Sequence, residues 1–267
     1  MVALVTGATS RVGSATVRRL AREPGARLVL VARHEDRLRA LAHEIAGATV
    51  VAVDLTDDDA PARVAEAVER EHGQLDLLVN NAGTVRFGQF AKGGFEDVRG
   101  HMAINFDAPV RLIEALLPLL RRSAPSAIVN VVSLAARIGR RHLGAYAASK
   151  SALAGWSEVL HVEERPHRVH VGLVVLGASS KEIFHHHELE RGERLLKAQL
   201  EHAAEAILAA GPGGRAERYV PRRHWLPAAM RLLTPGLLRW RMGRRLPRGR
   251  DPHLASRLLA RARSLLD

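Results

Sequence analysis

The chain has 267 residues, 47% of them hydrophobic, and it contains no cysteine. This length suits one large α/β domain with a sizeable core, and the apolar content argues against a chain that is disordered throughout. Without cysteine the protein has no disulfide, no thiolate nucleophile and no cysteine metal site. We therefore expect a protein of a reducing compartment, the cytoplasm.

The formal net charge is +12 at pH 7. Lysine occurs only at positions 92, 150, 181 and 197, so most of the positive charge is carried by arginine. Two explanations are open: a general bias toward arginine, or an anionic partner such as a phosphate-bearing cofactor, a membrane surface or nucleic acid. No RNA-binding motif or zinc-finger spacing is present, so we expect no nucleic-acid partner.

The chain begins directly with the strand-like residues Met1–Val5. No basic leader, long apolar stretch or cleavage site precedes them, so we expect no signal peptide. No run of about 18 apolar residues occurs either, so we expect no membrane-spanning helix.

Short apolar runs in the first two thirds of the chain predict buried strands. In chain order they are Val2–Thr6, Leu28–Ala32, Val50–Val53, Leu75–Val79, Ala127–Val132 and Val169–Leu176. Amphipathic stretches alternate with them and predict the helices Val12–Arg22, Arg37–Ala46, Ala60–Glu71, Arg99–Leu120 and Tyr146–Glu164. We expect Pro109 and Pro118 to bend or bound the long fourth helix. This alternation indicates an α/β fold with a parallel sheet covered by helices on both faces.

The pattern changes after the sixth strand. Residues 177–199 are polar and include three consecutive histidines at 185–187. Leu200–Ala210 predicts a helix. The segment Arg222–Arg250 contains nine arginines and no acidic residue, interleaved with tryptophan, leucine and methionine. A short terminal helix is predicted over Leu254–Leu266.

A glycine-rich turn, Thr6–Gly13, connects the first strand to the first helix. In such a strand–turn–helix unit, backbone amides and the helix N-terminus can face a pyrophosphate. Gly7 suits the tight turn, and Gly13 suits close packing of the helix on the strand.

Further candidate ligand residues follow the next strands. At the end of the second strand, Arg33 stands where an acidic residue would hold the ribose hydroxyls of NAD; arginine there favours the 2′-phosphate of NADP. The alternative is that Arg33 is one more residue of an arginine-rich chain. Asp54 follows the third strand and is placed to contact an adenine edge. Asn80–Gly83 (Asn-Asn-Ala-Gly) follows the fourth strand and is expected to line the ligand crevice at the carboxyl edge of the sheet.

Tyr146 and Lys150 are four residues apart on a predicted helix, so their side chains can reach one substrate. Tyrosine ionises near pH ~10, and a nearby ammonium lowers its pKa, which suits acid–base chemistry on a carbonyl or alcohol oxygen. Ser133, after the fifth strand, could hold the substrate oxygen. Asn105 could hold a water or a bent backbone. Taken alone, most pairs with this spacing are an ordinary exposed helix face.

Together these residues resemble the short-chain dehydrogenase/reductase family, closely over residues 1–176 and loosely over 177–220. The landmarks occur in the family's order: TGxxxxxG at Thr6–Gly13, the acidic Asp54, NNAG at 80–83, Asn105, Ser133 and YxxxK at 146–150. The resemblance implies a Rossmann-type doubly wound parallel sheet of about seven strands in a single domain. It also implies hydride transfer between NADP(H), or NAD(H), and a carbonyl/alcohol pair.

The resemblance implies roles for individual residues. Tyr146 would be the general acid–base, Lys150 would hold the nicotinamide ribose and lower the tyrosine pKa, Ser133 would position the substrate oxygen, and Asn105 would order a water. The implied cofactor-binding residues are Thr6, Gly7, Thr9, Ser10, Arg11, Val12, Gly13, Arg33, Asp54, Leu55, Asn81, Ala82, Gly83, Tyr146, Lys150, Gly177 and Ser179. A homodimer or homotetramer formed through the two long helices is also implied.

Two positions depart from the family pattern. Arg11 replaces the middle glycine of TGxxxGxG, where a side chain could crowd the cofactor or could itself bind phosphate. The family's Pro-Gly after the sixth strand is absent, and Leu176–Lys181 stands in its place; Ser179 or Ser180 could replace the family's threonine. Both departures concern the cofactor. They leave open a second hypothesis, a catalytically weak relative that acts as a nucleotide-binding or regulatory module.

The remaining segments carry weaker predictions. We expect residues 177–200 to form a substrate lid, and we expect no metal at residues 185–187, because consecutive histidines point in different directions. The basic extension, residues 221–267, has two interpretations for its segment 222–250. It could contact an anionic membrane surface peripherally, or its apolar side could pack on the core or on a neighbouring subunit. Either way, apolar surroundings favour a hydrophobic substrate.

Overall fold

In the computed structural model, residues 1–177 and 191–236 are described. The chain divides into two compact units, Met1–Ala228 and Ala229–Asp267. The fold and the site described below belong to the first unit. The seven strands of its sheet are β1 (Val2–Thr6), β2 (Arg27–Ala32), β3 (Thr49–Ala52), β4 (Leu77–Asn80), β5 (Ser126–Ser133), β6 (Val169–Leu176) and β7 (Glu217–Val220).

All neighbouring strands are parallel, and their order is β3-β2-β1-β4-β5-β6-β7. The order reverses direction between β1 and β4, which creates a crevice outside the carboxyl ends of these two strands. The predicted Rossmann-type, doubly wound parallel sheet is confirmed, as is its strand number. The strands are buried because helices cover both faces of the sheet.

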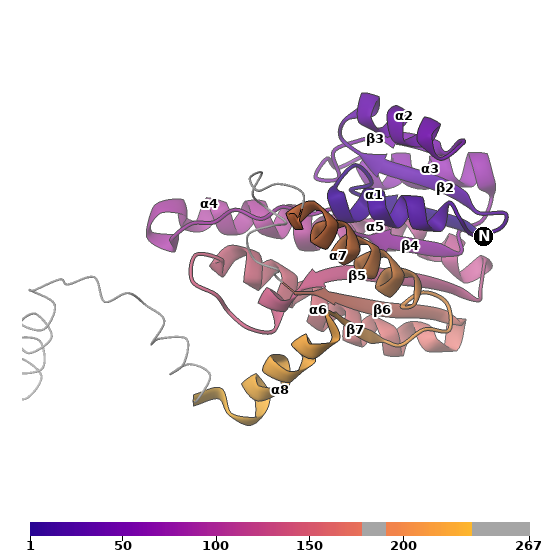
Figure 1. Ribbon diagram of the computed structural model, residues 1–267. Coiled ribbons are helices and arrows are strands. Elements are labelled where there is room, and N and C mark those ends of the chain that lie inside the picture. Colours follow the sequence, from indigo (N-terminus) through magenta and orange to yellow (C-terminus); the bar gives the residue numbers. More distant parts are fainter. Residues whose placement is uncertain (178–190, 237–267) are drawn as a thin grey trace, which may run out of the picture. The chain divides into compact units, whose positions relative to one another are not determined.

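The helices of the described residues are α1 (Arg11–Leu20), α2 (Glu35–Glu44), α3 (Ala60–His72), α4 (Phe90–Met102), α5 (Ala108–Arg122), α6 (Gly144–Glu164), α7 (Arg191–Leu208) and α8 (Trp225–Leu233). Alternate residues of a strand point to opposite faces. Accordingly, Ala3 and Val5 of β1 lie in the core beneath α1, α2 and α7, whereas Val2 and Leu4 lie in the core beneath α3, α5 and α6. Figure 1 shows α1 and α7 side by side on one face.

The predicted long helix over Arg99–Leu120 is wrong in its form. The helix begins earlier, at Phe90, and a π-helical turn at Ala103–Asp107 separates α4 from α5. Pro109 lies in the first turn of α5, directly after the π-helical turn. Pro118 lies inside α5. The π turn contains Asn105, one of the predicted site residues.

The region after β6 differs from its prediction in two respects. Helix α7 begins at Arg191, so residues 191–200 of the expected lid are helical; residues 178–190 lie outside the described part. The sequence pattern did not predict the edge strand β7, Glu217–Val220. The predicted terminal helix, Leu254–Leu266, and residues 237–250 of the basic segment also lie outside the described residues.

Candidate active site

The turn from β1 to α1 is built around two glycines. Gly7 has a φ of +60°, and a Cβ placed on it would lie 2.9 Å from the Cα of Ala82. A Cβ on Gly13 would lie 2.1 Å from the carbonyl oxygen of Gly7. Ser10 caps α1, because its Oγ accepts the Gly13 N–H at 3.1 Å. The turn can therefore bring the N-terminus of α1 close to a ligand in the crevice.

Asn81 joins this turn to the end of β4. Its side-chain amide donates to the carbonyl oxygens of Thr6 and Gly7 at 3.0 and 3.2 Å. The Thr6 hydroxyl in turn accepts the N–H groups of Asn81 and Ala82, both at 3.0 Å. Thr6 is buried, and its hydroxyl also donates to the Val79 carbonyl at 3.3 Å, so these bonds connect the ends of β1 and β4.

A cavity of about 510 Å³ lies along this crevice. Its walls include nine of the predicted cofactor residues: Gly7, Thr9, Ser10, Arg33, Asp54, Leu55, Asn81, Ala82 and Gly83. Gly7 approaches the backbone of Ala82 so closely that no side chain fits on Gly7 itself. These features fit a dinucleotide, with its pyrophosphate facing α1 and its adenosine end facing β2 and β3.

The β2–β3 end of the cavity is basic. Arg33 lies 3.9 Å from the carboxylate of Asp54, and its side chain is 70% exposed. The amide of Thr56 donates to Asp54 at 3.0 Å; this bond, with smaller contributions from the Thr56 hydroxyl and Arg33, holds the pKa of Asp54 below its usual value. His34 and Arg37 line the same end of the cavity. The cations outnumber the single carboxylate.

Ser133, at the end of β5, forms a side-chain hydrogen bond with Tyr146 in the first turn of α6. Burial raises the pKa of the Tyr146 phenol above its usual value, and the bond from Ser133 lowers it by less. The expected lowering of the tyrosine pKa by Lys150 is therefore not present in this structure. Here the serine, and not the lysine, is the group that favours the phenolate.

Lys150 is 5% exposed, and its Nζ donates to the carbonyl oxygen of Val131 at 3.0 Å. Burial lowers its pKa to about 8. A Cβ placed on Gly83 would lie 3.3 Å from Lys150 Nζ and 2.6 Å from Asn105 Oδ1. Glycine at this position therefore leaves room for the ends of both side chains.

Asn105 is fully buried in the π-helical turn. Its Oδ1 accepts the Thr84 N–H at 2.9 Å, and its Nδ2 donates to the Thr84 carbonyl and the Ser149 hydroxyl, both at 3.0 Å. The asparagine thus joins the segment after β4 to α6. Asn105 and Lys150 both lie next to Gly83, which lines the cavity, and Ser133 bonds to Tyr146; the four side chains themselves are not among the residues that line the cavity.

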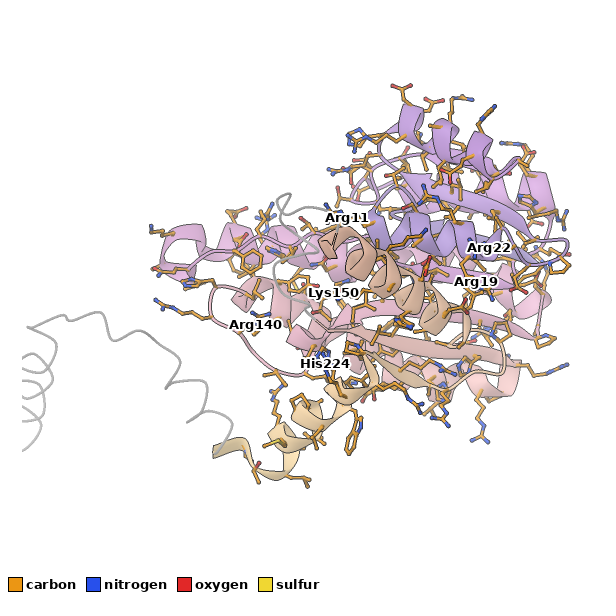
Figure 2. All side chains as sticks on the ribbon, in the orientation of Figure 1. Arg11, Arg19, Arg22, Arg140, Lys150 and His224 are labelled. Atoms are coloured by element: carbon orange, nitrogen blue, oxygen red, sulfur yellow. The ribbon has the colours of Figure 1, made fainter. Side chains whose placement is uncertain are left out.

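Other predicted residues lie apart from this arrangement. Val12 and Gly177 line a second cavity, of about 1020 Å³, beside α7. Gly177 packs against the ring of His224, which leaves no space for a side chain. Arg11 is the half-buried first residue of α1, and Figure 2 labels it together with Lys150. Ser179 lies outside the described residues.

Sequence reasoning missed several residues of the first cavity, among them Arg37, Arg86 and Ile104. Arg37 follows Arg33 by four residues, and this spacing was an available signal. Arg86 reaches the cavity because its Nε binds Asp97 at 3.1 Å and its guanidinium packs over Gly100. That arrangement depends on the fold of α4, which no local pattern contains.

Within residues 1–177 and 191–236, no group of histidine and acidic side chains has the arrangement of a metal site. Over the same ranges, no helix combines the length and apolarity needed to cross a bilayer.

Residues 1–191 match the family model described as short chain dehydrogenase. A probable short-chain type dehydrogenase/reductase of Helicobacter pylori is 32% identical over 176 residues, which cover 66% of this chain and 64% of that protein. The aligned region thus spans less than two thirds of that relative's length. The chain belongs to the short-chain dehydrogenase/reductase family.

Two solved structures extend the similarity beyond the aligned sequence. A short-chain dehydrogenase from Streptomyces avermitilis has a TM-score of 0.74 and 28% identity, covering 91% of this chain and 97% of that one. A metagenomic short-chain oxidoreductase in complex with NADP has a TM-score of 0.65 and 34% identity, covering 82% of this chain and 96% of that one.

Proposed function

We propose that this protein is an oxidoreductase that transfers a hydride between NADP(H) and a carbonyl/alcohol pair, with Tyr146 as the general acid–base. The observation that carries the proposal is the Ser133–Tyr146 hydrogen bond, in a chain that also holds a cavity whose lining fits a dinucleotide. When bound, the nicotinamide supplies or accepts the hydride at the substrate carbon. Every other step belongs to side chains of this chain.

In the reducing direction, the Ser133 hydroxyl and the Tyr146 phenol donate to the substrate carbonyl oxygen and orient it. As the hydride reaches the carbonyl carbon, the phenol gives its proton to the oxygen, and the product is an alcohol. The phenolate that remains is stabilised by the Ser133 hydroxyl. In the oxidising direction, the phenolate removes the proton from the alcohol.

Lys150 and Asn105 maintain this cycle. We propose that Lys150 binds the nicotinamide ribose and that Asn105 keeps the π-helical turn in place, with a water that connects Lys150 to solvent. Val131 now accepts the lysine N–H at 3.0 Å, which leaves two ammonium protons for these partners. The remaining proposed cofactor contacts are those of the glycine-rich turn, Asp54, Leu55 and Asn81–Gly83.

We propose a preference for NADP(H) over NAD(H). Arg33, His34 and Arg37 supply cationic or neutral donors at the adenosine end of the cavity, where the 2′-phosphate would lie. The NADP complex of the metagenomic relative is consistent with this preference. A hydrophobic substrate is proposed as well, because Phe87, Phe90 and Phe95 expose their rings on the segment that follows the end of β4.

We also propose that two or four copies assemble through α5 and α6. Val159 and Val162 of α6 are 57% and 68% exposed, which is unusual for neighbouring valines on a helix unless a second surface covers them. Light scattering would give the mass directly. For the basic segment 222–250, sedimentation with anionic vesicles at low salt distinguishes membrane contact from packing, since only membrane contact gives pelleted protein.

The central test follows NADPH oxidation with a panel of aldehydes and ketones. We expect turnover by the wild type, a loss of about 10³-fold or more in Tyr146→Phe, and little change in Tyr219→Phe, the matched control at the only other tyrosine. The Tyr146→Phe protein should still bind NADPH. Loss in both variants, or none in Tyr146→Phe, would refute the proposed mechanism.

A second candidate function is a nucleotide-binding or regulatory module. Arg11 in the glycine-rich turn and the absence of Pro-Gly at Leu176–Gly177 favour it, because both changes lie where the family contacts its cofactor. Bound NADPH without turnover of any carbonyl compound would support this candidate.

A further inference from the structure

His101, in the last turn of α4, is a fully buried residue that no motif identified. Its Nε2 lies 3.1 Å from the backbone nitrogen of Arg86, which can only donate. Its Nδ1 lies 2.7 Å from the carbonyl oxygen of Asp97 and 3.4 Å from the Asp97 carboxylate, which can only accept. These partners assign a neutral imidazole with its hydrogen on Nδ1.

The same ring packs against the ring of Tyr146. The two ring centroids are 6.3 Å apart with an interplanar angle of 67°. This is the edge-to-face geometry that aromatic pairs prefer. His101 therefore contacts the proposed acid–base on one side and, through Arg86, the segment that lines the dinucleotide cavity on the other.

Asn105 makes the corresponding pair of contacts one helical turn later. It binds Thr84 of the same segment and Ser149 of the same helix α6. Residues 101 and 105 thus form two successive bridges between the segment after β4 and α6. Of the two, the His101 bridge is the one that contacts the ring of Tyr146.

We propose that His101 is a positioning residue for Tyr146: it holds the phenol in the direction needed for proton transfer and keeps water from that side of the ring. The inference rests on the proposed role of Tyr146. The requirement is specific to histidine. Leucine can neither accept the Arg86 N–H nor present a ring, and glutamine can accept that N–H but has no ring for Tyr146.

The test uses the fact that the chain contains only two tyrosines, Tyr146 and Tyr219. Protein labelled with ¹³C at the tyrosine ring carbon that bears the hydroxyl gives two NMR signals, and the one absent from Tyr146→Phe belongs to Tyr146. We expect His101→Leu to shift the Tyr146 signal and to leave the Tyr219 signal unchanged. The control is His161→Leu, which removes a histidine of α6 that contacts His170. It should shift neither tyrosine signal by as much as His101→Leu shifts the Tyr146 signal.

Kinetics supply a second readout that a purely structural role would not move in this way. His101→Leu and His101→Gln should lower kcat by about tenfold or more, with NADPH binding within about threefold of wild type. The pH at which kcat is half-maximal should fall, because water beside the phenol opposes the burial that raises its pKa.

The outcomes are decisive in each case. A folded His101→Leu protein with an unchanged Tyr146 signal overturns the inference, as do equal shifts of both tyrosine signals. If His101→Leu does not fold, His101→Gln decides on the same criteria. Because the NMR measurement needs no turnover, failure of this inference is distinguishable from failure of the proposed function.

Discussion

The buried amine of Lys150 on α6 donates a hydrogen bond of 3.0 Å to the backbone carbonyl of Val131 on β5. The sheet therefore supports the lysine directly, and a neutral oxygen, rather than a carboxylate, accepts its bond. Burial without a bonded counter-charge lowers the pKa of Lys150 from 10.5 to about 8. This has a consequence for stability that is independent of catalysis.

We predict that the free energy of unfolding contains a Lys150 contribution that rises with pH between about 8 and 10. Below pH 8 both states carry the proton and the folded state bears the full cost of the buried charge. Between the folded pKa and 10.5 the unfolded state binds the proton and the folded state does not, so stability increases with pH. The shift corresponds to at most about 3 kcal/mol.

Denaturant unfolding of wild type and Lys150→Met at pH 7 to 9.5 would measure this contribution. The difference between the two proteins should shrink as pH rises. Measurement above pH 10 is avoided because Tyr146, whose pKa burial raises, then acts in the opposite direction. Parallel pH curves for the two proteins would contradict the prediction.

Substitution of Ser133 should impair proton transfer. Ser133→Ala removes the only bonded group that lowers the pKa of Tyr146, so the pH at which the phenol ionises should rise and kcat/KM at pH 7 should fall by about 10²-fold. Ser133→Thr keeps a hydroxyl and should retain much of the rate. Ser151→Ala removes a hydroxyl that bonds the Ala136 carbonyl, and it serves as the control. An unchanged pH–rate profile in Ser133→Ala would count against the assignment.

Arg33→Ala and Arg37→Ala should each weaken NADPH binding by about tenfold and leave NADH binding unaltered, because a charge-assisted bond to the 2′-phosphate is lost. Fluorescence titration with both cofactors gives the ratio. Arg70→Ala is a matched control: Arg70 is equally exposed and binds Glu71 on α3. Equal weakening for NADPH and NADH would show that the arginines act on the part common to both.

Arg11→Gly should strengthen NADPH binding if the side chain crowds the cofactor at the first residue of α1. Arg11→Ala, which keeps Cβ and removes the long side chain, separates the two sources of crowding. Titration of NADPH by fluorescence measures both variants. Weaker binding by the glycine variant would instead identify Arg11 as a phosphate ligand.

The fold was predictable where apolar runs are long and have sharp ends. The boundaries of Val2–Thr6 and Val169–Leu176 agree with β1 and β6 without adjustment. The predicted fourth strand began at Leu75, two residues before β4, because the apolar Leu75 and the polar Asp76 continue the alternation that is typical of a strand. In the structure, the Leu75 N–H binds the Ser123 hydroxyl, and the Asp76 carboxylate accepts the Val2 N–H. These long-range bonds leave no local signal.

The missing strand has a different cause. β7 is a four-residue edge strand, and its side chains are only partly buried. Because an edge strand needs few apolar residues, Glu217–Val220 shows neither an apolar run nor a clear alternation of apolar and polar residues. The π-helical turn around Asn105 escaped prediction because the apolar period continues through it. Its cause is tertiary: Asn105 binds the backbone of Thr84 on both sides.

For the site, the motif landmarks indicated which residues lie near one another, and the structure shows which hydrogen bonds they make. Spacing alone placed Tyr146 and Lys150 on one helix face. It could not indicate that Lys150 would bond to Val131, or that Ser133 would be the polar partner of the phenol. Both facts depend on how β5 lies against α6, which is a property of packing and not of sequence period.

Beneath the crevice, three buried polar side chains connect β4, β5 and α6. Asn80 donates to Asn130 at 2.9 Å, and Asn130 donates to Ser157 at 2.8 Å. An apolar contact at these positions would tolerate a small slide of the helix along the sheet, but directional bonds between buried amides do not. These bonds therefore fix the position of α6 against β5, and with it the distance from Ser133 at the end of β5 to Tyr146 near the start of α6. The loops above can consequently vary, and with them the choice of substrate, without moving the two hydroxyls apart.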